Sequence, residues 1–100
     1  MKSITVIELK NKIDGAEDIQ LIDVRELEEH DGFNIGGDLI PLHHVTQQID
    51  NISKDKPVIF YCRKGIRSQI AIQRLLDKYP FKNLYNLIGG TEAWRKQFGI

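Results

Sequence analysis

The feature that most constrains the fold is a short apolar run that leads, through a loop, into an amphipathic segment. Residues 58–61 are continuously apolar and follow Pro57. A run of this kind is typical of a strand buried on both faces, as in a parallel sheet. From Ser68, apolar residues recur at helical spacing until Pro80, at Ala71, Ile72, Leu75, Leu76 and Tyr79. This spacing predicts a helix that ends at Pro80.

The rest of the chain repeats this alternation of strand and helix. Short strands are expected at 20–24, 38–40 and 84–87. Helices are expected at 6–13, where Thr5 and Glu8 have capping-box spacing, at 25–30 before the turn at Asp31 and Gly32, at 42–52 and at 91–97. Strands separated by helices predict an α/β fold, with a parallel sheet and helices on both faces. Ligands of such sheets bind beyond the carboxyl ends of the strands, where Cys62 and Asp23 are expected to lie.

Length and composition favour one ordinary globular domain. The chain has 100 residues, of which 41% are hydrophobic and 28% charged, so residues 1–100 are expected to form a single domain. No apolar run approaches membrane-spanning length, and a cytoplasmic protein without membrane contact is the expectation. The net charge is zero and no basic-aromatic array is present, which argues against nucleic-acid binding. Residues 1–50 carry 11 acidic and 4 basic side chains, and residues 51–100 carry 3 acidic and 10 basic ones. Folding is expected to mix the charges of the two halves over the surface.

Cys62 is the only cysteine and the strongest candidate for chemistry. A lone cysteine excludes an intramolecular disulfide, a dithiol motif and a multi-cysteine zinc site. The cations Arg63, Lys64 and Arg67 follow it, together with Gly65 and a helix start, and such surroundings lower a thiol pKa below its usual ~8.5. The alternative is a buried small hydrophobe at a strand end. In the reactive case, the backbone amides of residues 63–68 would cradle a small, negative group on the sulfur.

Four segments of the sequence together resemble rhodanese-like sulfurtransferases. The segments are Tyr61-Cys62-Arg63-Lys64-Gly65-Ile66-Arg67-Ser68, Leu21-Ile22-Asp23-Val24-Arg25-Glu26, Gly32-Phe33-Asn34-Ile35-Gly36-Gly37 with Ile40-Pro41-Leu42, and the stretch from Leu84 to Trp94. They occur in the family's order and cover nearly the whole chain. The resemblance implies a rhodanese-like parallel sheet of about five short strands. Asn34 stands where the family usually has histidine, which is expected to affect local packing more than chemistry.

The resemblance implies a two-step transfer of sulfane sulfur. The Cys62 thiolate would take sulfur from a small anionic donor such as thiosulfate, and the resulting persulfide would pass it to cyanide, a thiol or a sulfur-relay protein. The substrate-binding residues would be the loop members Arg63, Lys64, Gly65, Ile66, Arg67 and Ser68, which supply amides and positive charge. Arg67 is expected to do structural work, with Asp23 as a candidate partner and support of the site. No metal or organic cofactor is needed.

Two other functions remain open from the residues. Cysteine phosphatases and arsenate reductases also hold a thiolate in an amide cradle, but the phosphatase signature has five residues between cysteine and arginine. Here only four separate Cys62 from Arg67, and Tyr61 replaces the usual preceding histidine. A persulfide carrier or a regulatory binding module is the other alternative, although such modules often lack the cysteine.

Several further residues are expected to be structural. His30 has no evident partner, and the acidic side chains of residues 26–31 are expected to form a solvated helix face. The adjacent His43 and His44 would diverge on a helix, so a solvated or capping role is favoured over metal ligation. The aromatic residues Tyr79, Trp94 and Phe98 are expected in the core.

Overall fold

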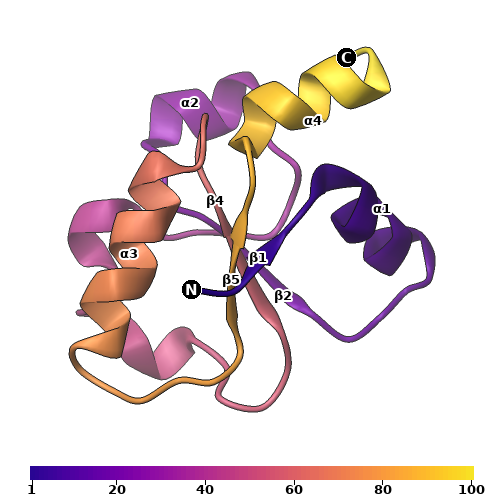
Figure 1. Cartoon of the computed structure of the whole chain (residues 1–100). Helices are drawn as coiled ribbons and strands as arrows, with labels where there is room; N and C mark the ends of the chain where they lie inside the picture. Colours follow the sequence, from indigo (N-terminus) through magenta and orange to yellow (C-terminus); the bar gives the residue numbers. More distant parts are fainter.

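A five-stranded parallel sheet forms the centre of the protein, as the computed structural model of residues 1–100 shows (Figure 1). The strand order is β1-β5-β4-β2-β3, and every neighbouring pair is parallel. The strands are β1 (Ser3–Ile4), β2 (Gln20–Asp23), β3 (Asp38–Leu39), β4 (Val58–Tyr61) and β5 (Leu84–Leu87). The helices are α1 (Val6–Asp14), α2 (Leu27–Gly32), α3 (Ile66–Leu76) and α4 (Gly90–Phe98). The α/β class and the parallel sheet with helices on both faces are thus confirmed.

The central strand β4 explains why the core has two halves. Its four residues are completely buried, and successive side chains of a strand point to opposite faces. Val58 and Phe60 join a cluster of 13 buried residues on one face, whereas Ile59 and Tyr61 join a cluster of seven on the other. A strand with both faces covered needs an uninterrupted apolar run, as residues 58–61 provide.

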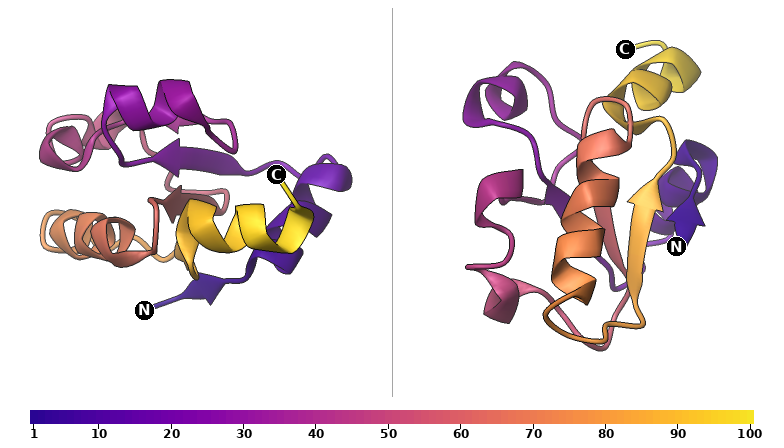
Figure 2. Two further views of the ribbon diagram at one scale, coloured as in Figure 1. Left: turned by 90° about the horizontal axis from the view of Figure 1, so that it is seen from above. Right: turned by 60° about the vertical axis from the view of Figure 1, so that its left-hand side comes forward.

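Each face of the sheet is covered by its own helices. The buried side of α3, with Ala71, Ile72 and Leu75, packs on the larger cluster, and α1 and α4 contribute Leu9 and Trp94 to the smaller one. Figures 1 and 2 show α3 on one side of the sheet and α1 with α4 on the other.

Helix α1 begins with the capping box expected from its sequence. Thr5 Oγ1 accepts a hydrogen bond from the Glu8 amide at 3.1 Å, and Glu8 Oε1 accepts one from the Thr5 amide at 2.9 Å. These two bonds satisfy donors that a helix start otherwise leaves free.

Some element boundaries differ from the sequence-based prediction. The two-residue strand β1 was not predicted, because two residues carry no periodicity and their pairing with β5 is a tertiary contact. Residues 42–52 form two separate 3₁₀ turns (Leu42–His44 and Ile49–Asn51) in place of one helix. Helix α3 starts at Ile66 and ends at Leu76, before Pro80. Tyr79 is therefore beyond the helix and 38% exposed, so its predicted place in the core is wrong.

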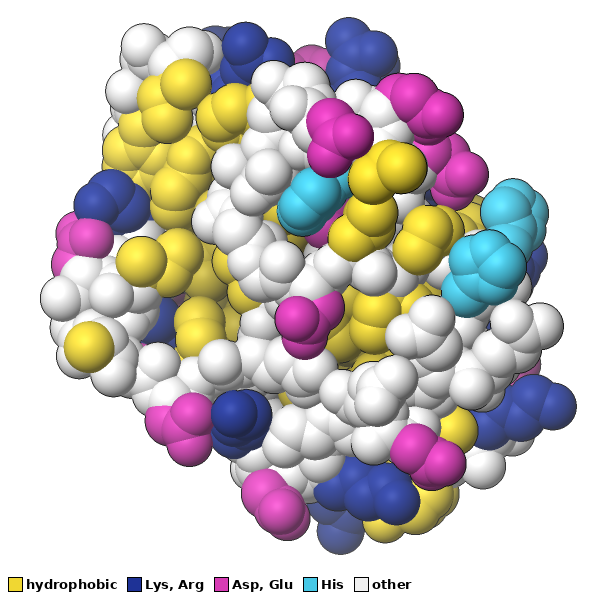
Figure 3. Space-filling view, turned by 180° about the vertical axis from the view of Figure 1, so that it is seen from behind, with side chains coloured by type: hydrophobic (Ala, Val, Ile, Leu, Met, Phe, Trp, Pro, Cys, Tyr) yellow, Lys and Arg dark blue, Asp and Glu magenta, His cyan; other side chains and the backbone are white.

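The carboxyl ends of the strands meet at one edge of the sheet, and three helices lie or begin there. In Figure 1 this edge is at the top, with α2 and the first turns of α3 and α4. The back of the molecule shows acidic and basic side chains interspersed around its rim (Figure 3), as expected for interleaved halves. None of the helices is both long and apolar enough to span a membrane.

Candidate functional site

Cys62 lies directly after β4, at the carboxyl edge of the sheet. Only 1% of its surface is exposed, and its sulfur faces the loop that connects β4 to α3. The amide of Gly65 donates to Sγ at 3.1 Å and the amide of Ser68 at 3.4 Å, while Ser68 Oγ lies 3.5 Å from Sγ. The loop therefore turns backbone N–H groups towards the sulfur, as an anion cradle requires.

These contacts change the proton affinity of the Cys62 thiol. Burial opposes the charged form and on its own raises the pKa. Hydrogen bonds from the amides of Ser68, Gly65 and Lys64 favour the thiolate, and the pKa of Cys62 is lowered despite its burial. The arrangement supports an activated thiol over a buried structural cysteine.

The loop holds its shape because two glycines allow the backbone to turn and pack closely. Gly65 has φ +98°, a region that favours glycine, and it immediately precedes α3. Gly90, with φ +58°, approaches the loop so closely that a Cβ there would lie 2.2 Å from the Cys62 carbonyl oxygen. The amides of Thr91 and Glu92 then donate to the carbonyls of Cys62 and Arg63, at 2.9 and 3.0 Å. The start of α4 thus anchors the start of the loop.

Arg67 pairs with Glu29 and not with Asp23, which corrects the expected pairing. Its two terminal nitrogens donate to the two carboxylate oxygens of Glu29 at 2.7 and 2.8 Å. Glu29 therefore does not belong to a purely solvated acidic face, because it ties α2 to the first turn of α3. The hydrogen bonds from Arg67 are the main cause that lowers the pKa of Glu29 to about 2.

We expect this ion pair to make stability depend on pH in acid. The usual pKa of Glu29 is 4.5 and the folded value is about 2, so its contribution is complete above pH 4.5 and is lost as the pH falls towards 2. Because both side chains are about one-third exposed, solvent screening limits the contribution to about 1 kcal/mol. Urea unfolding should show Glu29→Gln less stable than wild type near neutral pH and nearly equal to it near pH 2.

The control for this measurement is Glu28→Gln, which removes the same charge one residue earlier. Glu28 is exposed on the same helix and makes no ion pair, so its replacement should leave stability nearly unchanged. Equal effects of the two substitutions at every pH would contradict the assigned role of the Arg67–Glu29 pair.

Asp23 supports the carboxyl edge through a different set of partners. Its fully buried carboxylate accepts from Arg25 Nη2 at 2.8 Å and lies 2.9 Å from His30 Nδ1. Arg25 also donates to the carbonyl of Phe33 at 2.5 Å, which ties β2 to the chain beyond α2. The expectation that His30 has no partner is therefore wrong. Asn34 donates to the His30 carbonyl at 3.0 Å.

The cations nearest the mouth of the site remain available to an anion. Arg63 is 67% exposed and makes only a loose contact with Glu92, 3.6 Å between Nε and Oε2, and Lys64 makes no ion pair. A cavity of about 160 Å³ opens beside the sulfur, and its lining residues are Cys62, Arg63, Lys64, Ile66 and Arg67. Its size and charge suit a small anion.

One residue that sequence reasoning missed is Asn86, on β5. Its Oδ1 accepts from Ser68 Oγ at 2.5 Å and its Nδ2 donates to the Gly65 carbonyl at 3.2 Å. Asn86 begins the run Asn86-Leu87-Ile88-Gly89-Gly90 in the stretch that resembles the family, but the local sequence does not indicate a contact with the loop after Cys62. Only the pairing of β5 with β4 brings it beside the loop.

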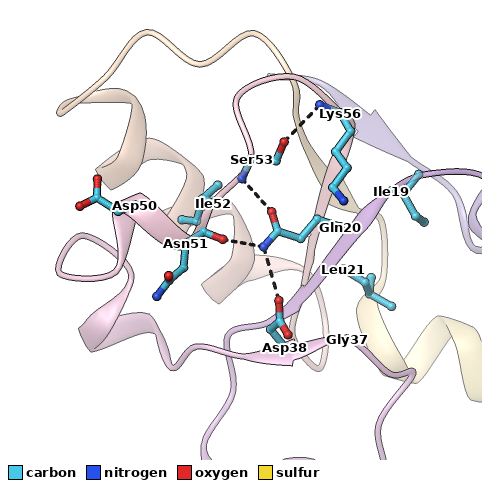
Figure 4. Close-up of a pocket in the computed structure, with 10 residues that line it drawn as sticks. All are labelled: Ile19, Gln20, Leu21, Gly37, Asp38, Asp50, Asn51, Ile52, Ser53 and Lys56. Carbon is cyan, nitrogen blue, oxygen red and sulfur yellow. Dashed lines mark hydrogen bonds between the residues drawn. The ribbon is translucent and has the colours of Figure 1, made fainter.

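The largest cavity, about 540 Å³, lies elsewhere. Its lining includes Gln20 and Asp38, which begin β2 and β3, so it opens at the amino end of the strands (Figure 4). Gln20 uses its amide to bind Asn51 O, Asp38 Oδ2 and the Ser53 amide. Its lining contains no cysteine or histidine, and Ser53 Oγ accepts a hydrogen bond from the Lys56 amide. No group of three or more His, Cys, Asp or Glu side chains is placed to hold a metal ion.

Comparison with known proteins gives one consistent result. The family model described as "Rhodanese-like domain" matches residues 5–97. The chain is 41% identical over 95 residues to the Bacillus subtilis protein "Uncharacterized protein YqhL", covering 94% of this chain and 72% of that protein. It is 35% identical over 79 residues to "Thiosulfate sulfurtransferase GlpE" of Coxiella burnetii, covering 78% and 73%. A crystal structure of a rhodanese-like domain protein from Staphylococcus aureus superposes with a TM-score of 0.82 at 32% identity, covering 94% and 91%.

Proposed function

Because this chain belongs to the rhodanese-like domain family, we propose that it is a sulfurtransferase that carries sulfane sulfur on Cys62. The observation that carries this proposal is the cradle around Sγ, in which the amides of Gly65 and Ser68 donate to a thiol with a lowered pKa. Arg63, Lys64 and Arg67 line the cavity beside this thiol. Residues 1–100 are proposed to act as one domain.

In the first step, the Cys62 thiolate attacks the outer sulfur of thiosulfate or a similar donor. An S–S bond forms between Sγ and that sulfur, and the bond to the sulfite group breaks, so that sulfite leaves with the electron pair. The negative charge then resides on the terminal sulfur of the persulfide. Amides of residues 63–68 stabilise that charge, and Arg63 and Lys64 attract the donor and stabilise departing sulfite.

In the second step, a nucleophilic acceptor attacks the terminal sulfur. With cyanide, a C–S bond forms, the S–S bond breaks, and thiocyanate leaves while the Cys62 thiolate is restored. Neither step needs an external oxidant or reductant, because each step exchanges one bond to the sulfane sulfur for another and Cys62 returns to the thiolate. A thiol or a sulfur-relay protein is the proposed physiological acceptor, since no second cysteine exists to unload the persulfide within the chain.

A persulfide carrier is the second candidate function. A large apolar side chain lines the cavity beside the sulfur: Ile66, the first residue of α3, is 64% exposed. A small anion makes no use of exposed apolar surface, whereas a docking protein does. This observation favours exchange with a partner protein alongside turnover of small molecules.

Turnover measured with thiosulfate, with a protein persulfide and with an aryl phosphate distinguishes these functions. We expect turnover of thiosulfate and cyanide to thiocyanate, with no hydrolysis of an aryl phosphate. Slow thiosulfate turnover with fast loading from a protein persulfide would identify a carrier. Rapid aryl phosphate hydrolysis without thiocyanate formation would overturn the sulfurtransferase proposal in favour of phosphoryl chemistry.

A further inference from the structure

Asn86 connects two parts of the loop that surrounds the thiol. The carbonyl oxygen of Gly65 only accepts hydrogen bonds, so the nitrogen of the Asn86 amide must face it, at 3.2 Å. The amide oxygen then faces Ser68 Oγ, at 2.5 Å. Because that oxygen has no hydrogen of its own, the hydrogen of this short bond comes from the Ser68 hydroxyl.

The direction of that hydrogen determines how Ser68 meets Cys62. A hydroxyl has one hydrogen, and when it is donated to Asn86, the lone pairs of Ser68 Oγ remain for Sγ, 3.5 Å away. The thiol fits this arrangement, since S–H donates to Oγ and Oγ–H donates to Asn86. The thiolate does not, because it needs a donor where the hydroxyl presents lone pairs.

We propose that Asn86 is a positioning residue that directs the Ser68 hydroxyl away from the sulfur and so favours the states of Cys62 in which Sγ carries no charge. There are two such states, the thiol and the persulfide, whose inner sulfur is neutral. The thiolate must either break the Ser68–Asn86 hydrogen bond or face the lone pairs of Ser68. Asn86 thus stabilises the sulfur-loaded protein relative to the empty thiolate, a consequence that rests on the proposed sulfur transfer.

The surrounding charges are the same in wild type, Asn86→Leu and Ser68→Ala. The charged side chains around the loop are Arg63, Lys64 and Arg67 on the loop and its helix, Asp23 and Arg25 at the end of β2, Glu29 on α2 and Glu92 on α4. The β5 side chain that contacts the loop is the uncharged Asn86. A change of Cys62 pKa on replacing Asn86 therefore reports hydrogen bonding and loop shape, not a lost charge.

The test is a double-mutant cycle on the pKa of Cys62, measured from the pH dependence of its alkylation by iodoacetamide. Asn86→Leu frees the Ser68 hydroxyl to donate to the thiolate, and we expect the pKa to fall by about one unit, a tenfold change in the acid dissociation constant. In a Ser68→Ala background the same substitution should leave the pKa nearly unchanged. Asn86→Leu also removes the hydrogen bond to the Gly65 carbonyl, but it does so in the wild-type and in the Ser68→Ala background, so this effect cancels when the two pKa shifts are subtracted.

Equal shifts in the two backgrounds, or a higher pKa in Asn86→Leu alone, would overturn the proposal. If Asn86→Leu does not fold, Asn86→Asp serves in its place, because it keeps the shape and the acceptor. That change should raise the pKa, and by more when Ser68 is present than in Ser68→Ala, whereas equal rises would count against the proposal.

The alkylation measurement does not depend on sulfur transfer. A second readout does: at a fixed ratio of thiosulfate to sulfite, the persulfide fraction found by intact mass should be severalfold lower in Asn86→Leu than in wild type. Absence of persulfide in wild type would contradict the proposed function while leaving the pKa cycle to decide the role of Asn86.

Discussion

Replacing Cys62 with serine abolishes the uptake of sulfur from thiosulfate, and with it all turnover. Serine keeps the size and a hydrogen-bonding atom, but a hydroxyl at this position stays protonated, whereas the amides of Gly65 and Ser68 favour a thiolate. An S–S bond also cannot form on oxygen. We expect wild type to gain the mass of one sulfur atom after thiosulfate, to lose it on addition of cyanide, and Cys62→Ser to remain unchanged by either reagent.

Wild-type protein alkylated at Cys62 is a matched control for that experiment. Since the chain has only one cysteine, alkylation modifies a single thiol and leaves the sequence intact. The alkylated protein should likewise gain no sulfur. Thermal melting should show Cys62→Ser folded, so that the lost reaction reflects the missing thiol. Retained turnover in Cys62→Ser would exclude the proposed persulfide.

Replacing Gly90 with alanine is expected to damage both the fold and the site. The added Cβ would lie 2.2 Å from the Cys62 carbonyl oxygen and 2.6 Å from the Arg63 carbonyl, both of which are backbone atoms. It would also sit at φ +58°, a conformation that L residues rarely adopt. We expect the free energy of unfolding to fall by about 3 kcal/mol or more, measured by urea denaturation. The folded fraction should show strongly reduced turnover, because α4 would no longer hold the carbonyls at the start of the loop.

Gly99→Ala is the control that separates the two effects of Gly90→Ala, the steric clash of the added Cβ and the unfavourable backbone conformation. Gly99 has φ +68°, close to that of Gly90, but a Cβ there meets nothing within 4 Å. Its replacement should cost only about 1 kcal/mol and leave turnover unchanged. Similar losses in the two variants would mean that the close approach of Gly90 to Cys62 is unimportant.

The sequence predicted the elements that are long or strongly patterned. The buried run 58–61, the amphipathic spacing of α3 and the Thr5–Glu8 capping box each carry their signal within a few residues, and the structure has all three. Residues 42–52 carry apolar side chains at helical spacing, at Leu42, Val45, Ile49 and Ile52, yet they form two 3₁₀ turns, so the predicted helix is wrong. The four apolar side chains do pack on one core cluster, so the spacing predicted the buried face of this segment but not whether its backbone forms one continuous helix.

The partners of the polar residues at the carboxyl edge were predicted poorly. The sequence offers Asp23 as a candidate partner for Arg67 and none for His30. In the structure Arg67 binds Glu29, and Asp23 binds Arg25 and His30. Several carboxylates lie within reach of this edge, so charge type alone does not select among them. The choice depends on where α2 packs against α3, which is a tertiary relation.

The sequence by itself determined the α/β class, the candidate nucleophile Cys62 and the glycine-containing cationic loop after it, because these depend on apolar periodicity and on neighbours along the chain. Only the tertiary structure decided which residues of other elements contact that loop. Asn86 from β5, Glu29 from α2 and Gly90 from α4 reach the site only through parallel strand pairing and helix packing. The physical reason is that hydrogen bonds and close contacts act over a few ångströms in space, whereas these residues lie 18 to 38 positions from the loop residues they bind.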